Sequence, residues 1–164
     1  MELITMASLA TALLLQDAEP SAMSEAERVA RAYMSAYSQM DLEAMESYLA
    51  EDAEFEDRTA TGPLAGEDGH HYETRAETMA MLQGFQAQYN PIELGFVWHT
   101  VFESNDRVIF SGHVNALYPT QDSNQNFRWR AEQVTVITVR DGSVVRHQDF
   151  ANYAHPEQGL VPAD

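Results

Sequence analysis

The hydrophobic pattern from residue 24 onward has the period of a helix. Ser24 and Glu27 fit a capping box, in which side chain and backbone satisfy each other's open hydrogen bonds at the start of a helix. Asp41 can cap a second, shorter helix with its side chain. Between them, apolar residues recur at the spacing of one buried helix face: Ala26, Val29, Ala30, Tyr33, Tyr37 and Met40. The sequence therefore predicts two helices directly after residue 24.

The period changes to that of strands after residue 50. Two sets of side chains alternate over six residues: Ala53, Phe55 and Asp57 against Glu54, Glu56 and Arg58. A loop rich in Gly and Pro follows at 59–72, and then Thr74 and Glu77 form a second possible capping box for a third helix. We therefore expect one strand, a long loop and another helix in this part of the chain.

The rest of the chain reads as strands. Four segments show strand character: 92–103, 108–118, 127–140 and 143–153. The last two are joined at Asp141-Gly142, a strong signal for a tight hairpin turn. Helices first and a meander afterwards predict the α+β class, with helices packed on one face of an antiparallel sheet.

The length of 164 residues suits one domain. We expect this domain at 24–155, a C-terminal tail at 156–164 and an apolar leader at 1–22. The apolar run at 3–15 suits a secretory signal better than a membrane span, which needs about 20 residues. Because Glu2 replaces the usual Lys or Arg, an unprocessed N-terminal helix stays open. Cleavage would make the protein periplasmic or secreted, with no membrane contact in its mature form; otherwise it would be cytoplasmic.

The charge balance excludes some partners. The chain carries 26 acidic and 9 basic side chains, none of them Lys, for a formal net charge of -17. Such a surface repels phosphate backbones and anionic headgroups, so we expect no nucleic-acid partner. The acidity can also serve solubility alone. With no cysteine, disulfides, thiolate catalysis and Cys-ligated zinc are excluded.

Asp57 is the first candidate for chemistry, because its strand parity places it beside Ala53 and Phe55. A carboxylate turned inward costs several kcal/mol unless it is paired or neutral. Asp57 can therefore be a base in a pocket. Two other interpretations stay open, a cap of the following loop and a member of an ion pair.

The last strand holds the second candidates. Five residues share one of its faces: Val145, His147, Asp149, Ala151 and Tyr153. His147 and Asp149 side by side can exchange or steer a proton, because burial shifts both of their pKa values. The alternative is a structural ion pair. A metal site made of His147, Asp149 and His113 has little support, since no helical His pair or Cys accompanies it, and we expect no metal.

Other polar residues fall on faces whose orientation parity alone does not decide. His113 and Asn115 share one face of their strand, and Gln133 shares one with Thr135 on the next. Tyr33 lies on the buried stripe of the first helix, where an aromatic residue can be core or catalytic. We expect three histidines in the loop and the tail to be solvated: His70, His71 and His155.

Three stretches carry a family resemblance: AYMSAYSQMDLEAMESYLAEDAEFEDR, VFESNDRVIFSGHVNALY and VITVRDGSVVRHQDFANY. Over about residues 24–153 the chain resembles the NTF2-like superfamily, especially its SnoaL-like branch of polyketide cyclases and ketosteroid isomerase relatives. The resemblance implies a cone in which three N-terminal helices pack on a curved antiparallel sheet and enclose a pocket. Because this scaffold carries many unrelated chemistries, it implies the fold more strongly than the function.

Two enzymes of the superfamily imply where the site lies. Laid on ketosteroid isomerase, Tyr33 falls on the oxyanion-hole tyrosine and Asp57 on the proton-shuttling aspartate, but Gln133 or Thr135 stands near the second, acidic donor. Laid on limonene-epoxide hydrolase, Asp149 falls on the water-activating aspartate. The Arg-x-Asp of that enzyme becomes His113-x-Asn115, and its Tyr-x-Asn becomes Phe55-x-Asp57. Together the comparisons imply one cavity lined by Tyr33, Asp57, His113, Asn115, Gln133, His147 and Asp149.

Two hypotheses of function follow. In the first, the chain is an acid–base enzyme without a cofactor that isomerises, dehydrates, cyclises or hydrates a small apolar oxygenated molecule. Asp57 or the His147/Asp149 pair would transfer the proton, and Tyr33 with His113 or Asn115 would stabilise charge on the substrate oxygen. The substrate would also contact His113, Asn115, Gln133, Phe55 and Tyr153. In the second, the domain binds a ligand without turnover or serves dimerisation; a homodimer through the exposed sheet face is compatible with both.

Overall fold

The computed structural model describes residues 23–61 and 67–163. The leader expected at 1–22 lies outside the described residues. The helices are α1 (Glu25–Ser38), α2 (Leu42–Tyr48) and α3 (Arg75–Tyr89). The strands are β1 (Leu49–Asp57), β2 (His70–Tyr72), β3 (Glu93–Ser104), β4 (Arg107–Pro119), β5 (Gln125–Arg140), β6 (Ser143–Ala151) and β7 (Glu157–Pro162). The predicted α+β class is confirmed.

Each helix starts at the cap that the sequence predicts. The Ser24 hydroxyl accepts a hydrogen bond from the Glu27 backbone N–H at 3.0 Å. The Asp41 carboxylate accepts one from Ala44 at 3.1 Å, and the Thr74 hydroxyl accepts one from Glu77 at 3.2 Å. These side chains satisfy backbone donors that have no partner within the helix, so the short polar residues define where each helix begins.

The sheet is mixed. Its strand order is β2-β1-β6-β5-β4-β3, with β7 paired to β5 alone. All pairs are antiparallel except β1 and β6, which run parallel. The prediction of a purely antiparallel sheet is therefore wrong at this pair. A hairpin forces antiparallel pairing, but β1 and β6 are joined through most of the domain, so their direction is set by packing.

Two short strands lie where the sequence predicted none. β2 forms within the expected loop at 59–72 and pairs with the end of β1. β7 forms within the expected tail at 156–164 and pairs with residues 125–130 of β5. Since β6 pairs with β5 only from Gln133 onward, β7 continues along the edge that β6 leaves free.

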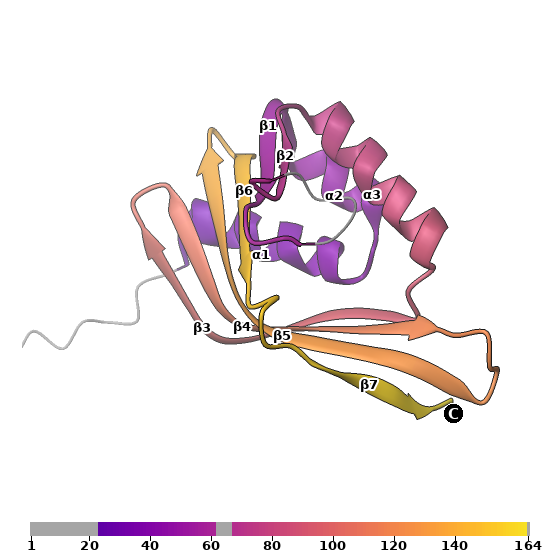
Figure 1. The fold of residues 1–164 in the computed structure, drawn as a ribbon. Coiled ribbons are helices and arrows are strands. Elements are labelled where there is room, and N and C mark those ends of the chain that lie inside the picture. The colour runs from indigo at the N-terminus through magenta and orange to yellow at the C-terminus, as the bar shows by residue number, and fades with distance from the viewer. Residues whose placement is uncertain (1–22, 62–66, 164) are drawn as a thin grey trace, which may run out of the picture.

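The three helices cover one face of the curved sheet, and its opposite face carries no helix of the described chain (Figure 1). The core fills the space between α1, α2 and the upper part of the sheet, with the largest sealed side chains at Tyr33, Met45, Phe110, Ile137 and His147. The far ends of β3, β4 and β5 reach beyond the helices, together with β7. In the described ranges none of the helices has the length and apolar character needed to cross a membrane.

A β-bulge sets the phase of β6. Thr138 pairs with Arg146, but the next residue of β5, Val139, pairs with Val144, so Val145 is an extra residue in the ladder. Val144 is consequently buried and Val145 only partly so. The prediction that Val145 shares the inner face is wrong. The alternation from His147 onward is as predicted, since His147, Asp149 and Ala151 are all buried.

Candidate functional site

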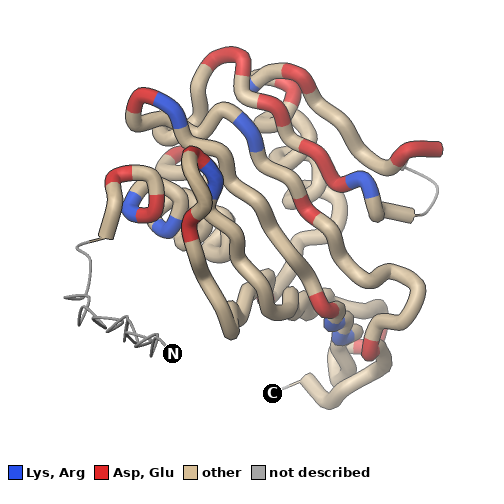
Figure 2. Tube along the Cα trace, turned by 90° about the vertical axis from the view of Figure 1, so that its left-hand side faces the viewer, with Lys and Arg blue, Asp and Glu red and all other residues tan. Residues whose placement is uncertain are grey.

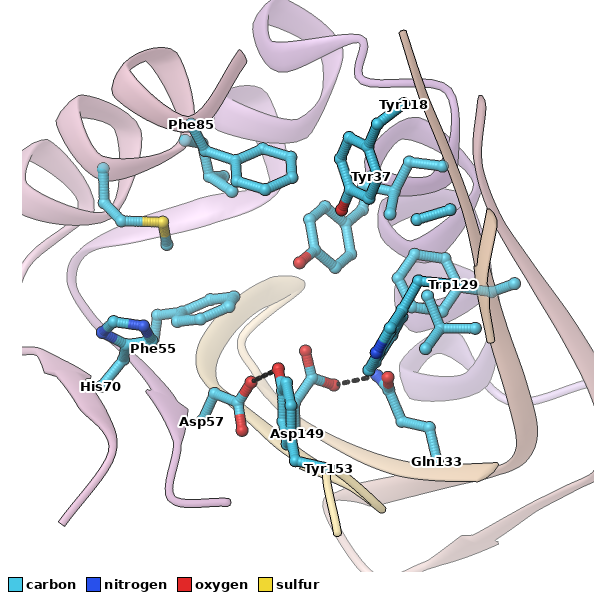
Figure 3. Close-up of a pocket in the computed structure, with 16 residues that line it drawn as sticks. Tyr37, Phe55, Asp57, His70, Phe85, Tyr118, Trp129, Gln133, Asp149 and Tyr153 are labelled. Atoms are coloured by element: carbon cyan, nitrogen blue, oxygen red, sulfur yellow. Dashed lines mark hydrogen bonds between the residues drawn. The ribbon is translucent and has the colours of Figure 1, made fainter. Parts of the chain in front are cut away.

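A cavity of about 180 Å³ opens between α1, α3 and the covered face of the sheet (Figure 3). Its walls are mainly aromatic, formed by Tyr37, Phe55, Phe85, Phe96, Tyr118 and Trp129. Its other polar side chains come from the strands and from the turn after β6: Asp57, His70, Gln133, Asp149 and Tyr153. An apolar chamber with a few converging polar groups is the usual form of a small-molecule site.

Two carboxylates share the floor of this cavity. Asp57 ends β1, and it is the register partner of Asp149 in β6. Neighbouring residues in register point to the same face of a sheet, so both side chains turn toward the cavity. Asp57 is 9% exposed and Asp149 is 5% exposed. The fold therefore holds two acids side by side in a largely apolar space.

Asp149 is fixed through one of its oxygens. Its Oδ1 accepts a hydrogen bond from Gln133 Nε2 at 2.7 Å and another from the Thr135 hydroxyl. Gln133 Nε2 also donates to the Thr135 hydroxyl at 2.9 Å, which orients that hydroxyl toward the carboxylate. In Figure 3 the second oxygen of Asp149 points up into the cavity. Oδ2 is therefore the atom that can take a proton from a bound molecule.

His147 and Tyr33 lie behind Asp149, not in the cavity. Both are fully buried, and the Tyr33 hydroxyl lies 2.8 Å from His147 Nδ1. Burial raises the pKa of Tyr33 well above its usual value, and the charge of Asp149 raises it further, so the phenol is the donor in this contact. The other ring nitrogen of His147 lies 3.0 Å from Asp149 Oδ1, close but not aligned as a hydrogen bond. The buried imidazole thus packs against the Asp149 carboxylate on the side away from the cavity.

Asp57 has a different environment. Its Oδ2 accepts a hydrogen bond from the Tyr153 hydroxyl at 2.6 Å, and its Oδ1 accepts bonds from the Thr59 hydroxyl and backbone N–H at 3.0 and 3.2 Å. Burial raises the pKa of Asp57, and the nearby charge of Asp149 adds to this against the opposing effect of the hydrogen bonds. A desolvated carboxyl group beside another negative charge holds its proton more tightly, so the site favours the protonated form of Asp57.

The structure places five of the nine predicted site residues in the cavity: Phe55, Asp57, Gln133, Asp149 and Tyr153. The other four do not line it. Tyr33 and His147 are sealed beneath its wall, as described above. His113 and Asn115 point to the opposite face of the sheet, because Val114, Ala116 and Tyr118 of the same strand face the cavity. Both faces of β4 are equally apolar in sequence, so alternation did not reveal which one was inside.

The surroundings of His113 confirm that it does not face the cavity. Its Nδ1 lies 3.3 Å from both His99 Nε2 and an Arg130 guanidinium nitrogen. Burial lowers the pKa of His113, and the charge of Arg130 lowers it further. Because His113 and the pair His147 and Asp149 lie on opposite faces, these three residues cannot bind one metal ion.

One other group of side chains brings potential metal ligands together. Atoms of Glu54, Glu56 and His71 lie within 4.8 Å of one another. Glu56, however, already accepts hydrogen bonds from Arg146 at 2.6 Å and from Arg58 at 3.1 Å. With two guanidinium groups on the central carboxylate, the cluster is an ion-pair network and a poor site for a cation.

The sequence reasoning missed several cavity residues. Tyr37 is one helical turn after Tyr33 on the stripe already recognised as buried, so helical spacing could have marked it. Trp129 shares strand parity with Gln133, which was also a readable signal. His70 gave no such signal, because it lies in the three-residue strand β2 and was expected to be solvated.

Gly69 helps to hold His70 against the site. Its φ is +77°, and a Cβ on this residue would lie 2.1 Å from the backbone oxygen of Asp57. A residue without a side chain is required there, both by the left-handed conformation and by the close approach. Gly69 thus brings β2 close to the end of β1, where Asp57 pairs with His70.

Solved structures share this fold. A SnoaL-like polyketide cyclase candidate from Shewanella denitrificans OS-217 aligns with a TM-score of 0.66 at 18% identity, over 79% of this chain and 91% of its own. An LEH-like epoxide hydrolase from M. tuberculosis aligns with a TM-score of 0.56 at 16% identity, over 79% and 84%. A ketosteroid isomerase candidate from Kribbella flavida DSM 17836 aligns with a TM-score of 0.55 at 20% identity, over 80% of each chain.

At such identities these similarities show the fold alone. No curated protein matches the sequence. The SnoaL-like domain family matches residues 30–147, which is well over half of the chain and includes most of α1, the first strand and His147. The three helices on a curved, unclosed sheet are likewise those of the NTF2-like cone that the sequence resemblance implied. The chain therefore belongs to the SnoaL-like domain family of the NTF2-like fold.

Proposed function

We propose that this protein is an acid–base enzyme that acts on a small, largely apolar molecule carrying an oxygen, with its own side chains moving the protons. The observation that carries the proposal is the pair Asp57 and Asp149, adjacent in register and both turned into one aromatic cavity. Such a pair can accept and donate protons in a cofactor-independent isomerase, dehydratase, cyclase or hydratase reaction.

The two acids suit different halves of a proton transfer. Asp149 Oδ2 would take a proton from a carbon next to a carbonyl group, which leaves an enolate and a protonated Asp149. Return of that proton to another carbon completes an isomerisation, with atoms and charge balanced. Asp57, whose pKa is raised by burial, can hold a proton beside the developing oxygen charge.

The cavity limits the size of the molecule. An apolar cavity of about 150 Å³ holds benzene, so a space of about 180 Å³ suits a substrate of one or two rings. The aromatic walls favour a flat or cyclic skeleton. The names of the related structures, among them a cyclase, an epoxide hydrolase and an isomerase, are compatible with oxygenated cyclic substrates but do not choose between reactions.

Proton exchange on a carbon acid tests the proposal. The full chain is incubated in D₂O with 2-tetralone and with 3-cyclohexen-1-one, and deuterium incorporation next to the carbonyl is followed by NMR. We expect exchange above the buffer rate with the wild type, and a loss of about 10²–10⁴-fold in Asp149→Asn. Asp52→Asn, which changes an exposed acid of the same strand β1 that carries Asp57, serves as the matched control and should exchange like the wild type.

Two results would count against the proposal. Equal exchange by Asp149→Asn and the wild type would remove Asp149 as the base. Binding of both ketones without any exchange above buffer would favour the alternative, a domain that binds ligands and does not turn them over.

A further inference from the structure

Two tyrosines of α1 stand one turn apart, and the fold gives them different positions. Tyr33 is fully buried, and its hydroxyl donates a hydrogen bond to His147. Tyr37 lines the cavity and is 8% exposed. Residues four apart lie on the same face of a helix. On this face of α1, Tyr33 lies in the buried core and Tyr37, one turn later, lies in the cavity wall.

The ring of Tyr37 is held by packing on several sides. It lies 5.2 Å from the ring of Phe96, 6.3 Å from that of Phe55 and 5.3 Å from that of His147, measured between centroids. The contacts with Phe55 and His147 are edge-on, at 81° and 85°. A ring fixed in this way places its hydroxyl at a defined point.

That hydroxyl points into the cavity toward the two carboxylates (Figure 3). Among the described residues no hydrogen-bond partner of this hydroxyl is found, and the residue borders the cavity, whereas the hydroxyls of Tyr33 and Tyr153 both have protein partners. Because Tyr37 lines the cavity, its hydroxyl is open to a molecule bound there. A ligand in the cavity would supply the missing partner.

We propose that Tyr37, and not Tyr33, donates the hydrogen bond to the substrate oxygen, facing Asp149 across the cavity. The inference rests on the proposed function and deepens it. It names the substrate as a cyclic or planar carbonyl compound whose oxygen reaches Tyr37 while the neighbouring C–H group faces Asp149 Oδ2. As that proton leaves, negative charge develops on the oxygen, where the phenol stabilises it.

The surroundings of Tyr37 suit a donor. Burial raises the pKa of this phenol well above its usual value, and the charge of Asp149 raises it further. The group therefore keeps its proton at neutral pH. A neutral, fixed donor close to the developing charge stabilises the transition state without needing to reorganise.

Two ligands that differ only in a carbonyl oxygen can distinguish a hydrogen bond donated by Tyr37 from packing of its ring. 2-Tetralone and tetralin have the same rings and differ in one carbonyl oxygen, which can only accept a hydrogen bond. Their affinities for the full chain are measured by calorimetry, with wild type, Tyr37→Phe, Tyr33→Phe and, as a control outside the cavity, Tyr48→Phe. We expect Tyr37→Phe to weaken 2-tetralone about tenfold, the effect of one lost hydrogen bond, and tetralin less than about twofold.

Tyr33→Phe provides the decisive comparison, because the family resemblance assigns the donor to Tyr33. A selective tenfold loss of 2-tetralone binding in Tyr33→Phe and none in Tyr37→Phe would overturn the inference. Equal weakening of both ligands by Tyr37→Phe would also overturn it, since that result means lost packing. Thermal unfolding of each variant shows whether it keeps the wild-type fold.

The result is independent of the test of Asp149. If Asp149→Asn leaves proton exchange unchanged while Tyr37→Phe selectively weakens 2-tetralone, the proposed base is wrong and the oxygen-binding role stands. If Asp149→Asn abolishes exchange while Tyr37→Phe binds both ligands like the wild type, the base stands and the role of Tyr37 is overturned. A wild type that binds neither ligand would overturn both.

Discussion

Glu56 and Asp57 are neighbours in β1, both are buried, and they lie on opposite faces of the sheet. Glu56, 3% exposed, accepts hydrogen bonds from Arg146, Arg58 and Gln148. Burial alone would raise its pKa, but these hydrogen bonds outweigh burial and lower it to about 2. For Asp57 burial prevails, and its pKa is raised. Its neighbours are hydroxyl groups and a second carboxylate.

The difference shows that burial does not make a carboxylate functional; its partners decide. Basic residues are scarce in this chain, 9 against 26 acidic ones, and Figure 2 shows few of them among the acidic positions. Two of the nine bind Glu56, and none forms an ion pair with Asp57 or Asp149 among the residues that the structure describes. A buried acid paired with cations is part of the structure, because removing one partner leaves the other charge buried and uncompensated. A buried acid opposite another acid is available for chemistry.

The largest expected effect on stability is at Glu56. Its pKa is lower in the folded chain than in the unfolded one, so its contribution is present above about pH 4.5 and is lost as the pH falls toward 2. We expect Glu56→Gln to lower the free energy of unfolding by up to about 3 kcal/mol at pH 6 and by much less at pH 2.5. Urea unfolding at the two pH values measures this.

The control for Glu56→Gln is Glu51→Gln, which changes an exposed acid of the same strand. It should alter the free energy of unfolding by no more than about 0.5 kcal/mol at either pH. An equal loss for Glu56→Gln at pH 6 and pH 2.5 would show that shape, not charge, accounts for the effect.

The second largest effect on stability is expected at Arg146, a hydrogen-bonding partner of Glu56. Arg146→Met keeps most of the stem but removes the guanidinium that lies 2.6 Å from the Glu56 carboxylate. Because Arg58 and Gln148 remain, we expect a loss of about 2 kcal/mol, as for one hydrogen bond to a buried charge. Arg140→Met removes an exposed Arg that pairs with Asp106 at 3.5 Å and should cost less than about 0.5 kcal/mol. Urea unfolding measures the free energy of unfolding of both variants. Similar losses in Arg146→Met and Arg140→Met would contradict the idea that an ion pair contributes more to stability when its carboxylate is buried.

The smallest expected effect on stability is at Asp57, where substitution should raise the free energy of unfolding. The pKa of Asp57 is raised in the folded state, so the folded chain favours its protonated form, and ionisation lowers stability as the pH rises through the folded pKa. Asn cannot ionise. Asp57→Asn should therefore gain stability at neutral pH, by less than about 1 kcal/mol because contacts with Thr59 and Tyr153 change, and the gain should vanish in acid. A loss at pH 7 as large as that of Glu56→Gln would make Asp57 a structural residue.

Much of the fold could be predicted because its signals are local. Ser24, Asp41 and Thr74 mark the helix starts through bonds to residues three positions ahead. Asp141 and Gly142 both adopt positive φ, at 51° and 75°, as the predicted tight hairpin requires. The short strands β2 and β7 were not predictable in this way, because each exists only through pairing with a distant strand.

The site was predicted in part, and the errors have different causes. Asp57 and Asp149 were identified because each interrupts an apolar face of its own strand. His113 was placed on the wrong side because β4 is apolar on both faces, and Val145 was misplaced by a bulge that depends on the pairing of β6 with β5. Tyr33 was favoured over Tyr37, although the helical stripe contains both.

The sequence by itself determined the order of the helices, the hairpin between β5 and β6 and the inward direction of its candidate acids, because capping, turn geometry and alternation act over a few residues. Only the tertiary structure decided that β1 and β6 run in parallel and in register, that Arg146 meets Glu56 and not Asp57, and that Tyr37, not Tyr33, is the tyrosine of α1 that lines the cavity. These features join residues far apart in the chain. Their electrostatic effect depends on distances that no local pattern encodes.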